Sequence, residues 1–129
     1  MKFGYTIIYV ADVRATLDFY ARAFGFATRF VTDDAQFGEL ETGATALAFA
    51  RHDVAAGSLP AGYRALDESD LPAGIEIGFT TEDVPAAYQR ALDAGAVSLA
   101  APRTKPWGQV VAYLRAPEGT LVELCTPMG

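Results

Sequence analysis

The strongest constraint on the fold is a pattern that occurs twice along the chain. Residues 3–10 are β-branched and aromatic, which predicts a strand. Asp12 follows at the position of a helix N-cap, apolar residues recur behind it at spacings of three and four, and Gly25 supplies the C-terminal stop. The second copy has an alternating strand at 75–80, an N-cap at Asp83 and a stop at Gly95. The sequence therefore contains an internal duplication.

Each predicted helix is followed by three short strand candidates, which turn-forming residues separate. They span residues 26–32, 36–41 and 45–50 in the first copy, and 97–100, 109–115 and 120–126 in the second. This order predicts an α+β protein built from two tandem βαβββ modules. Two such modules can set their sheets edge to edge and curl them into an open, cup-shaped β-sheet with the helices outside.

The length of 129 residues fits a single domain. We expect the first module over about 1–50, a linker over about 51–73 and the second module over about 74–129. The linker holds glycines, prolines and scattered acids without sustained periodicity. Two interpretations stay open for it: a plain surface connection, or a flap that carries Tyr63 and Arg64 over a pocket.

Charge and composition exclude several classes of partner. The net charge is −6 and the pI is about 4.6, which argues against nucleic acid because a nucleic-acid site needs a clustered basic face. No apolar run approaches the roughly 20 residues of a membrane-spanning helix. The first residues lack the pattern of a secretory signal, so we expect a cytoplasmic protein. Cys125 is the one cysteine and is expected to be a small buried hydrophobic residue.

Several motifs resemble those of a known family over nearly the whole chain. The first module opens with YTIIYVADV at 5–13 and continues to FGF at 24–26. The second module closes with PWGQ at 106–109 and APEGTLVEL at 116–124. These segments resemble the glyoxalase, bleomycin-resistance and extradiol-dioxygenase group, the vicinal oxygen chelate superfamily. The resemblance implies the tandem βαβββ fold, but one fold hosts many chemistries.

The resemblance also implies where a metal would be held. In metal-dependent members, the first and last strands of each module supply histidine, glutamine or glutamate ligands. Those positions fall here on Tyr5, on the stretch 47–49 without a good ligand, on Glu76 and on Glu123. Only Glu123 matches the family pattern, and a catalytic site normally needs three or four suitable ligands. We therefore expect no metal and no other cofactor; a divalent ion on Tyr5, Glu76 and Glu123 is the alternative.

Two glutamates are the main candidates for polar chemistry without a metal. If Glu76 and Glu123 both face the cup, they form a carboxylate pair in which repulsion raises one pKa. Glu76 also fits a solvated position, because it alternates with Ile75 and Ile77. His52 lies outside the ligand positions, and no nucleophile has a neighbouring base. No catalytic residue is assigned, and whether the chain is an enzyme stays open, with the non-enzyme interpretation preferred.

The predicted function is small-molecule binding of the bleomycin-resistance type, by metal-independent sequestration in an aromatic cup. Trp107 is interpreted either as a stacking wall or as packing over the core. The expected ligand is a small organic molecule, aromatic or cationic, and the resemblance implies a homodimer. The predicted ligand-binding residues are Tyr5, Phe49, Glu76, Trp107, Tyr113 and Glu123.

Two alternative functions remain. One is a metal-dependent lyase, isomerase or dioxygenase with an atypical ligand set. The other is an interaction module whose cup is closed by packing.

Overall fold

The computed structural model describes residues 1–128 and divides the chain into two compact units, Met1–Ala65 and a second unit that begins at Leu66. The first unit contains β1 (Tyr5–Val10), α1 (Val13–Phe24), β2 (Thr28–Val31), β3 (Phe37–Leu40), β4 (Ala46–Arg51) and α2 (His52–Ser58). The second contains the 3-10 helix η1 (Leu66–Glu68), β5 (Glu76–Thr80), α3 (Val84–Ala94), β6 (Val97–Thr104), β7 (Val110–Arg115) and β8 (Leu121–Cys125). The predicted tandem βαβββ fold is confirmed.

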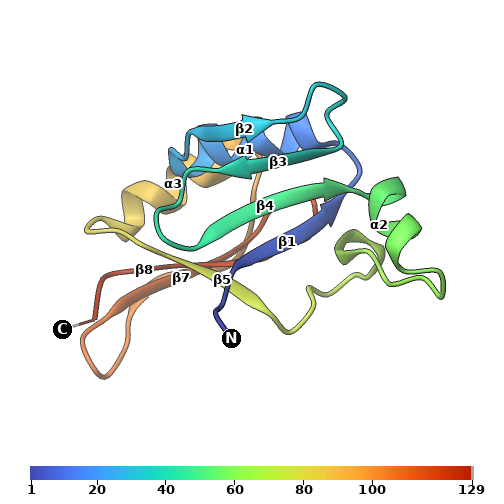
Figure 1. Cartoon of the computed structure of the whole chain (residues 1–129). Coiled ribbons are helices and arrows are strands. Elements are labelled where there is room, and N and C mark those ends of the chain that lie inside the picture. Colours follow the sequence, from blue (N-terminus) through green and yellow to red (C-terminus); the bar gives the residue numbers. More distant parts are fainter. Residues whose placement is uncertain (129) are drawn as a thin grey trace. The chain divides into compact units, whose positions relative to one another are not determined.

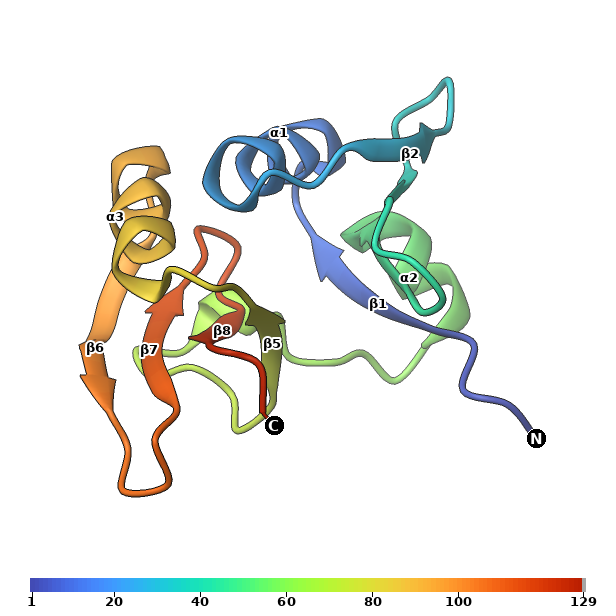
Figure 2. The ribbon, with the colours of Figure 1, turned by 90° about the vertical axis from the view of Figure 1, so that its left-hand side faces the viewer.

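The two sheets have the same topology; Figure 1 labels the strands of the first sheet, and Figure 2 labels those of the second. The strand order is β1-β4-β3-β2 in the first unit and β5-β8-β7-β6 in the second. The first strand of each module pairs in parallel with its last strand, and the other pairings are antiparallel. Both sheets are open, because neither closes on itself. The first and last strands of each module thus lie side by side although a helix and two strands separate them in sequence.

Local capping sets the helix boundaries where the sequence predicts them. The Asp12 carboxylate accepts a hydrogen bond from the Ala15 amide at 3.0 Å, and Asp83 does the same for Ala86 at 3.1 Å. Gly25 and Gly95 end the helices with φ angles of 79° and 119°. A side chain at these angles is strained, so glycine is the natural stop.

Each helix covers one face of its own sheet. In the first unit, Gly38 lets α1 approach closely, since a Cβ there would come within 2.7 Å of Leu17 Cδ1. Phe49 and Tyr20 are fully buried beside it, with ring centroids 5.0 Å apart. Figure 2 shows α3 beside β6 and β7 in the second unit, whose core includes Leu114 and Val122, both 0% exposed. The opposite face of each sheet is not covered by its module's helix.

Two elements differ from the sequence prediction. Residues 52–58 form α2 inside the expected linker, because a helix of seven residues is too short to display a period. The strand predicted at 97–100 extends to Thr104 and passes through Pro102. Proline is tolerated there because β6 is an edge strand, where a missing N–H need not break a ladder.

No helix among residues 1–128 has the length and apolar character needed to cross a membrane.

Candidate functional site

The sheet face of the second unit that α3 leaves uncovered carries the polar candidates. Strand alternation sends Leu114, Val122 and Leu124 into the core beneath α3, with at most 2% of each side chain exposed. Their neighbours point to the other side. We call this other side the open face; it includes Glu76, Gly78, Thr80, Val111, Tyr113, Leu121, Glu123 and Cys125.

Tyr113 and Glu123 form the polar centre of the open face. They lie directly opposite each other on β7 and β8, and the Tyr113 hydroxyl donates a hydrogen bond to Glu123 Oε1 at 3.3 Å. Burial raises the pKa of Tyr113, and the negative charges of Glu123 and Glu76 raise it further. The phenol is therefore protonated at neutral pH and available as a donor.

Glu76 lies on the same face as Glu123. Gly78 is the cross-strand partner of Glu123, and Glu76 precedes Gly78 by two residues, so the two carboxylates are diagonal neighbours. Desolvation raises the pKa of Glu76, and the charge of Glu123 adds to the shift. The sequence left open whether Glu76 is solvated or forms a carboxylate pair with Glu123. In the structure, Glu76 is exposed to solvent, and its carboxylate also interacts with that of Glu123.

Gly78 and Cys125 complete the surroundings of Glu123. A Cβ at Gly78 would lie 3.5 Å from Glu123 Oε2 and near nothing else, so glycine leaves this carboxylate oxygen open from the β5 side. Cys125 is 7% exposed and its thiol makes no hydrogen bond within residues 1–128. Burial raises the pKa of the thiol, followed by the charges of Glu123 and Glu76. Gly78 was not predicted from the sequence as part of the site. Its spacing of two residues from Glu76 could have placed it on the same face of the strand.

The remaining predicted ligand-binding residues lie elsewhere. Phe49 is 0% exposed and packs against Tyr20, on the face of the first sheet that α1 covers. It is a core residue here and is not carried into the candidate site. Tyr5 belongs to the first unit, where it begins β1 and is 64% exposed.

Trp107 lies in the hairpin between β6 and β7. It is 64% exposed, which does not fit packing over the core. Its Nε1 donates to Gln109 Oε1 at 2.9 Å, and Gln109 Nε2 donates to the Thr126 carbonyl at 2.9 Å. These two bonds hold the indole at the end of the hairpin with its ring accessible.

The donor set does not fit a catalytic metal centre. Within residues 1–128, no three histidine, cysteine or acidic side chains come close enough together to hold an ion. The open face supplies two carboxylates, Glu76 and Glu123, where a two-histidine, one-carboxylate triad or a closed shell needs three or four ligands. Tyr5 lies in the other unit.

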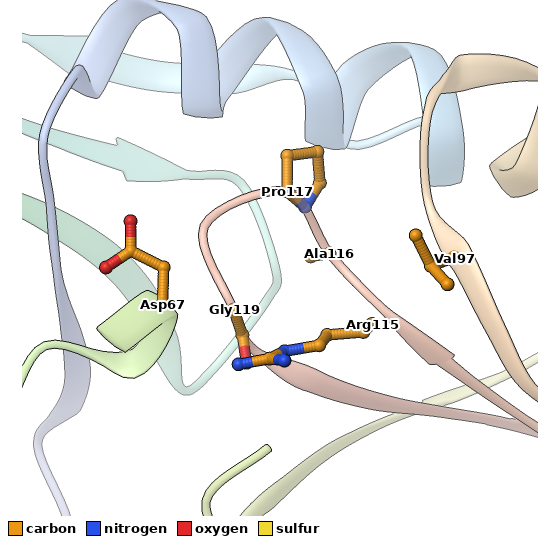
Figure 3. A pocket seen from close by; sticks show the side chains of 6 residues that line it. All are labelled: Asp67, Val97, Arg115, Ala116, Pro117 and Gly119. Atoms are coloured by element: carbon orange, nitrogen blue, oxygen red, sulfur yellow. The ribbon is translucent and has the colours of Figure 1, made fainter. Parts of the chain in front are cut away.

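A separate pocket of about 230 Å³ lies in the second unit (Figure 3). Its lining residues are Asp67, Val97, Arg115, Ala116, Pro117 and Gly119. Arg115 donates to the carbonyls of Leu66, Ser69, Asp70 and Gly119 at 2.9 to 3.3 Å. The guanidinium thus ties the second half of the expected linker to the turn between β7 and β8. No local pattern signals this clamp, because its partners lie up to 49 residues away in sequence.

The first half of the expected linker packs onto the first unit. The Tyr63 hydroxyl lies 2.6 Å from His52 Nδ1, and its ring centroid lies 4.9 Å from that of Tyr9 on β1. Tyr9 points away from α1, because its neighbours Ile8 and Val10 are the buried ones. Tyr63 therefore lies over the face of the first sheet that α1 does not cover. Arg64 is exposed. His52, which lies outside the expected ligand positions, is half-buried by this contact.

The architecture defines a class: two successive βαβββ modules, each with its first and last strands paired in parallel. The chain belongs to the Glyoxalase/Bleomycin resistance protein/Dioxygenase superfamily, whose family model matches residues 2–124. The resemblance inferred from the motifs is thereby confirmed.

Solved structures of low sequence identity share the fold. A glyoxalase-related enzyme from Fulvimarina pelagi matches with a TM-score of 0.81 at 18% identity, covering 100% of this chain and 93% of its own. A glyoxalase/bleomycin resistance protein/dioxygenase family enzyme from Burkholderia phytofirmans PsJN has a TM-score of 0.79 at 23% identity, covering 99% and 100%. A protein of unknown function from Agrobacterium tumefaciens str. C58 has a TM-score of 0.78 at 21% identity, covering 99% and 95%. No curated protein matches the sequence.

Proposed function

We propose that this chain binds a small organic molecule on the open face of its second sheet, without a metal ion. The observation that supports this most strongly is the grouping of Glu76, Tyr113 and Glu123 on a face that α3 does not cover. A ligand site needs an apolar surface with a few placed polar groups. Leu121 provides apolar surface in one flanking row of the same face, whereas Val111 in the other flanking row is only 2% exposed.

The proposal is tested by a ligand screen on ¹⁵N-labelled protein. Small organic fragments of both charges and neutral ones are added singly, and amide chemical shifts are followed. We expect a subset to shift the amides of β5, β7 and β8, and Glu123→Gln to weaken those hits. Glu82→Gln is the matched control, because Glu82 is an exposed glutamate outside the open face. Hits that map elsewhere, or a screen without hits, would argue against the proposed site.

A metal-dependent lyase, isomerase or dioxygenase is the second candidate. The single observation in its favour is that Glu76 and Glu123, two carboxylates, share one face, since carboxylates are the ligands that hard divalent ions prefer. Elemental analysis of protein purified without chelator separates the two candidates. About one metal per chain, lost together with turnover in Glu123→Gln, would favour this second candidate over the first.

We also propose that the protein is a homodimer, as its superfamily resemblance implies. In the described residues β1 pairs only with β4 and β5 only with β8, so each sheet has an edge at its module's first strand. Such edges pair readily with other chains unless they are protected. Light scattering at micromolar concentration measures the mass, and a monomer would contradict the proposal.

A further inference from the structure

The carboxylates of Glu76 and Glu123 flank Gly78 on the open face. We infer that the ligand carries a compact organic ammonium group, which is bound between these two carboxylates over Gly78. The inference rests on the proposed function and adds the charge of the ligand and the residue that limits the size of its cationic group.

The first support is the missing countercharge. Some acidic residues have their own cation: Asp18 pairs with Arg22, and Asp53 pairs with Arg51. Within residues 1–128, neither Glu76 nor Glu123 forms an ion pair. Two like charges near each other on a partly desolvated surface are unfavourable, and a cation bound between them relieves the repulsion. The site thus favours a positively charged group over a neutral one of the same shape.

The second support is a buried side chain without a partner beside the carboxylates. Cys125 lies on β8 two residues beyond Glu123, so both side chains point to the open face. It is more than nine-tenths buried, and its thiol makes no hydrogen bond within the described chain. It forms a polarizable wall next to the charged pair.

The third support is the space over Gly78. Its cross-strand partner is Glu123, and a Cβ built on it would meet only Glu123 Oε2 at 3.5 Å. Any larger side chain at this position would stand beside that oxygen. Glycine therefore keeps an approach to the carboxylate open on the β5 side, where Glu76 also lies.

The acceptors match an ammonium group better than a metal ion. A primary ammonium has three N–H donors, and Glu76, Glu123 and the Tyr113 phenol oxygen are three acceptors on one face. Tyr113 uses its own proton toward Glu123, which leaves its oxygen lone pairs to accept. A divalent ion needs at least one more hard ligand from the protein or several retained waters.

The experiment compares three probes of nearly equal shape: benzylamine, benzyl alcohol and phenylacetate. Each is titrated into ¹⁵N-labelled protein at pH 7, and the amide shifts of Gly78 and its strand neighbours give the dissociation constant. Benzylamine is expected to bind at least about tenfold more tightly than either other probe, because charge-assisted hydrogen bonds exceed neutral ones by that order. Glu76→Gln and Glu123→Gln should each remove most of this preference, while Glu82→Gln should keep it.

Gly78→Val tests the size limit. Gly78 lies on an exposed edge strand with nothing else nearby, so valine should leave the melting temperature unchanged or higher, since β-branched residues suit strands. Benzylamine binding should nevertheless fall about tenfold or more. Thr80→Val is the matched control on the same strand and face, and it should retain binding.

The outcomes separate this inference from the proposed function. If benzyl alcohol or phenylacetate binds the open face as well as benzylamine, the charge inference is wrong while the binding function stands. If benzylamine produces no shifts on β5, β7 and β8, or if millimolar Mg²⁺ displaces it completely, the ammonium inference is also overturned. The fragment screen described above then decides the proposed function independently.

Discussion

The Tyr113 hydroxyl donates its hydrogen bond to a carboxylate that has no cation: Glu123, its direct neighbour across β7 and β8. This bond joins two half-buried side chains and fixes the orientation of the carboxylate on the open face. The strength of this hydrogen bond and the negative charges of Glu76 and Glu123 have measurable effects on stability and on the reactivity of Cys125.

Tyr113→Phe removes the donor and leaves the Glu123 carboxylate without its protein partner. We expect the free energy of unfolding at pH 7 to fall by about 1 kcal/mol, below the full value of a charged hydrogen bond because solvent reaches the pair. Urea denaturation measures the change. Tyr5→Phe is the control, since Tyr5 is exposed and should lose almost nothing. Equal stability of the two variants would mean that the bond contributes little.

Glu76→Gln should stabilise the protein at neutral pH and not at acidic pH. The pKa of Glu76 is raised above its ordinary value of 4.5 in the folded state, so the folded protein holds this proton more tightly than the unfolded chain. Stability from this group is complete below pH 4.5 and is lost as the pH rises through the folded pKa. The free energy of unfolding of the variant should rise by about 0.5 kcal/mol at pH 7, which is the size of the repulsion in a like-charge diagonal pair. It should be unchanged near pH 4. A gain that does not depend on pH would contradict the electrostatic cause.

Cys125 should react slowly with iodoacetamide. Burial, then Glu123 and Glu76, raise the pKa of the thiol above its ordinary value of 9.0, and only the thiolate reacts. The alkylation rate is expected to keep rising beyond pH 9, and Glu123→Gln should increase the rate at pH 8 by removing one negative charge. A rate that levels off below pH 9 would show that the thiol is not perturbed in this direction.

Arg115→Gln should loosen the segment that precedes β5. The guanidinium donates to three carbonyls between Leu66 and Asp70 and to that of Gly119, so its loss leaves several acceptors without a partner. We expect a loss of about 2 kcal/mol and faster hydrogen exchange in residues 66–70. Arg103→Gln on β6 is the control, because Arg103 is exposed. Unchanged exchange in residues 66–70 would exclude a clamping role.

Features with a local cause were predictable from the sequence. The caps Asp12 and Asp83 and the stops Gly25 and Gly95 depend only on neighbouring backbone, so their positions agree with the structure. The internal duplication was recognised from these repeated caps and stops, and it predicted the tandem βαβββ fold.

Features that depend on strand pairing were less predictable. Around Phe49 both faces of β4 are apolar or small, so alternation cannot tell the helix-covered face from the uncovered one. The pairing of Glu76 with Glu123 on one face requires the parallel register of β5 and β8, which no local pattern encodes. The Arg115 clamp depends on contacts nearly fifty residues apart for the same reason. Contacts between residues so far apart produce no periodic pattern in the sequence.

The parallel pairing of first and last strands also governs the order in which each module forms during synthesis. β4 lies between β1 and β3, and β8 lies between β5 and β7, although each is the last strand of its module to leave the ribosome. Until then, the first strand has no partner within its sheet. The sheet of each module can therefore be completed only after its last strand has been made, and in both modules this depends on contacts between segments distant in sequence.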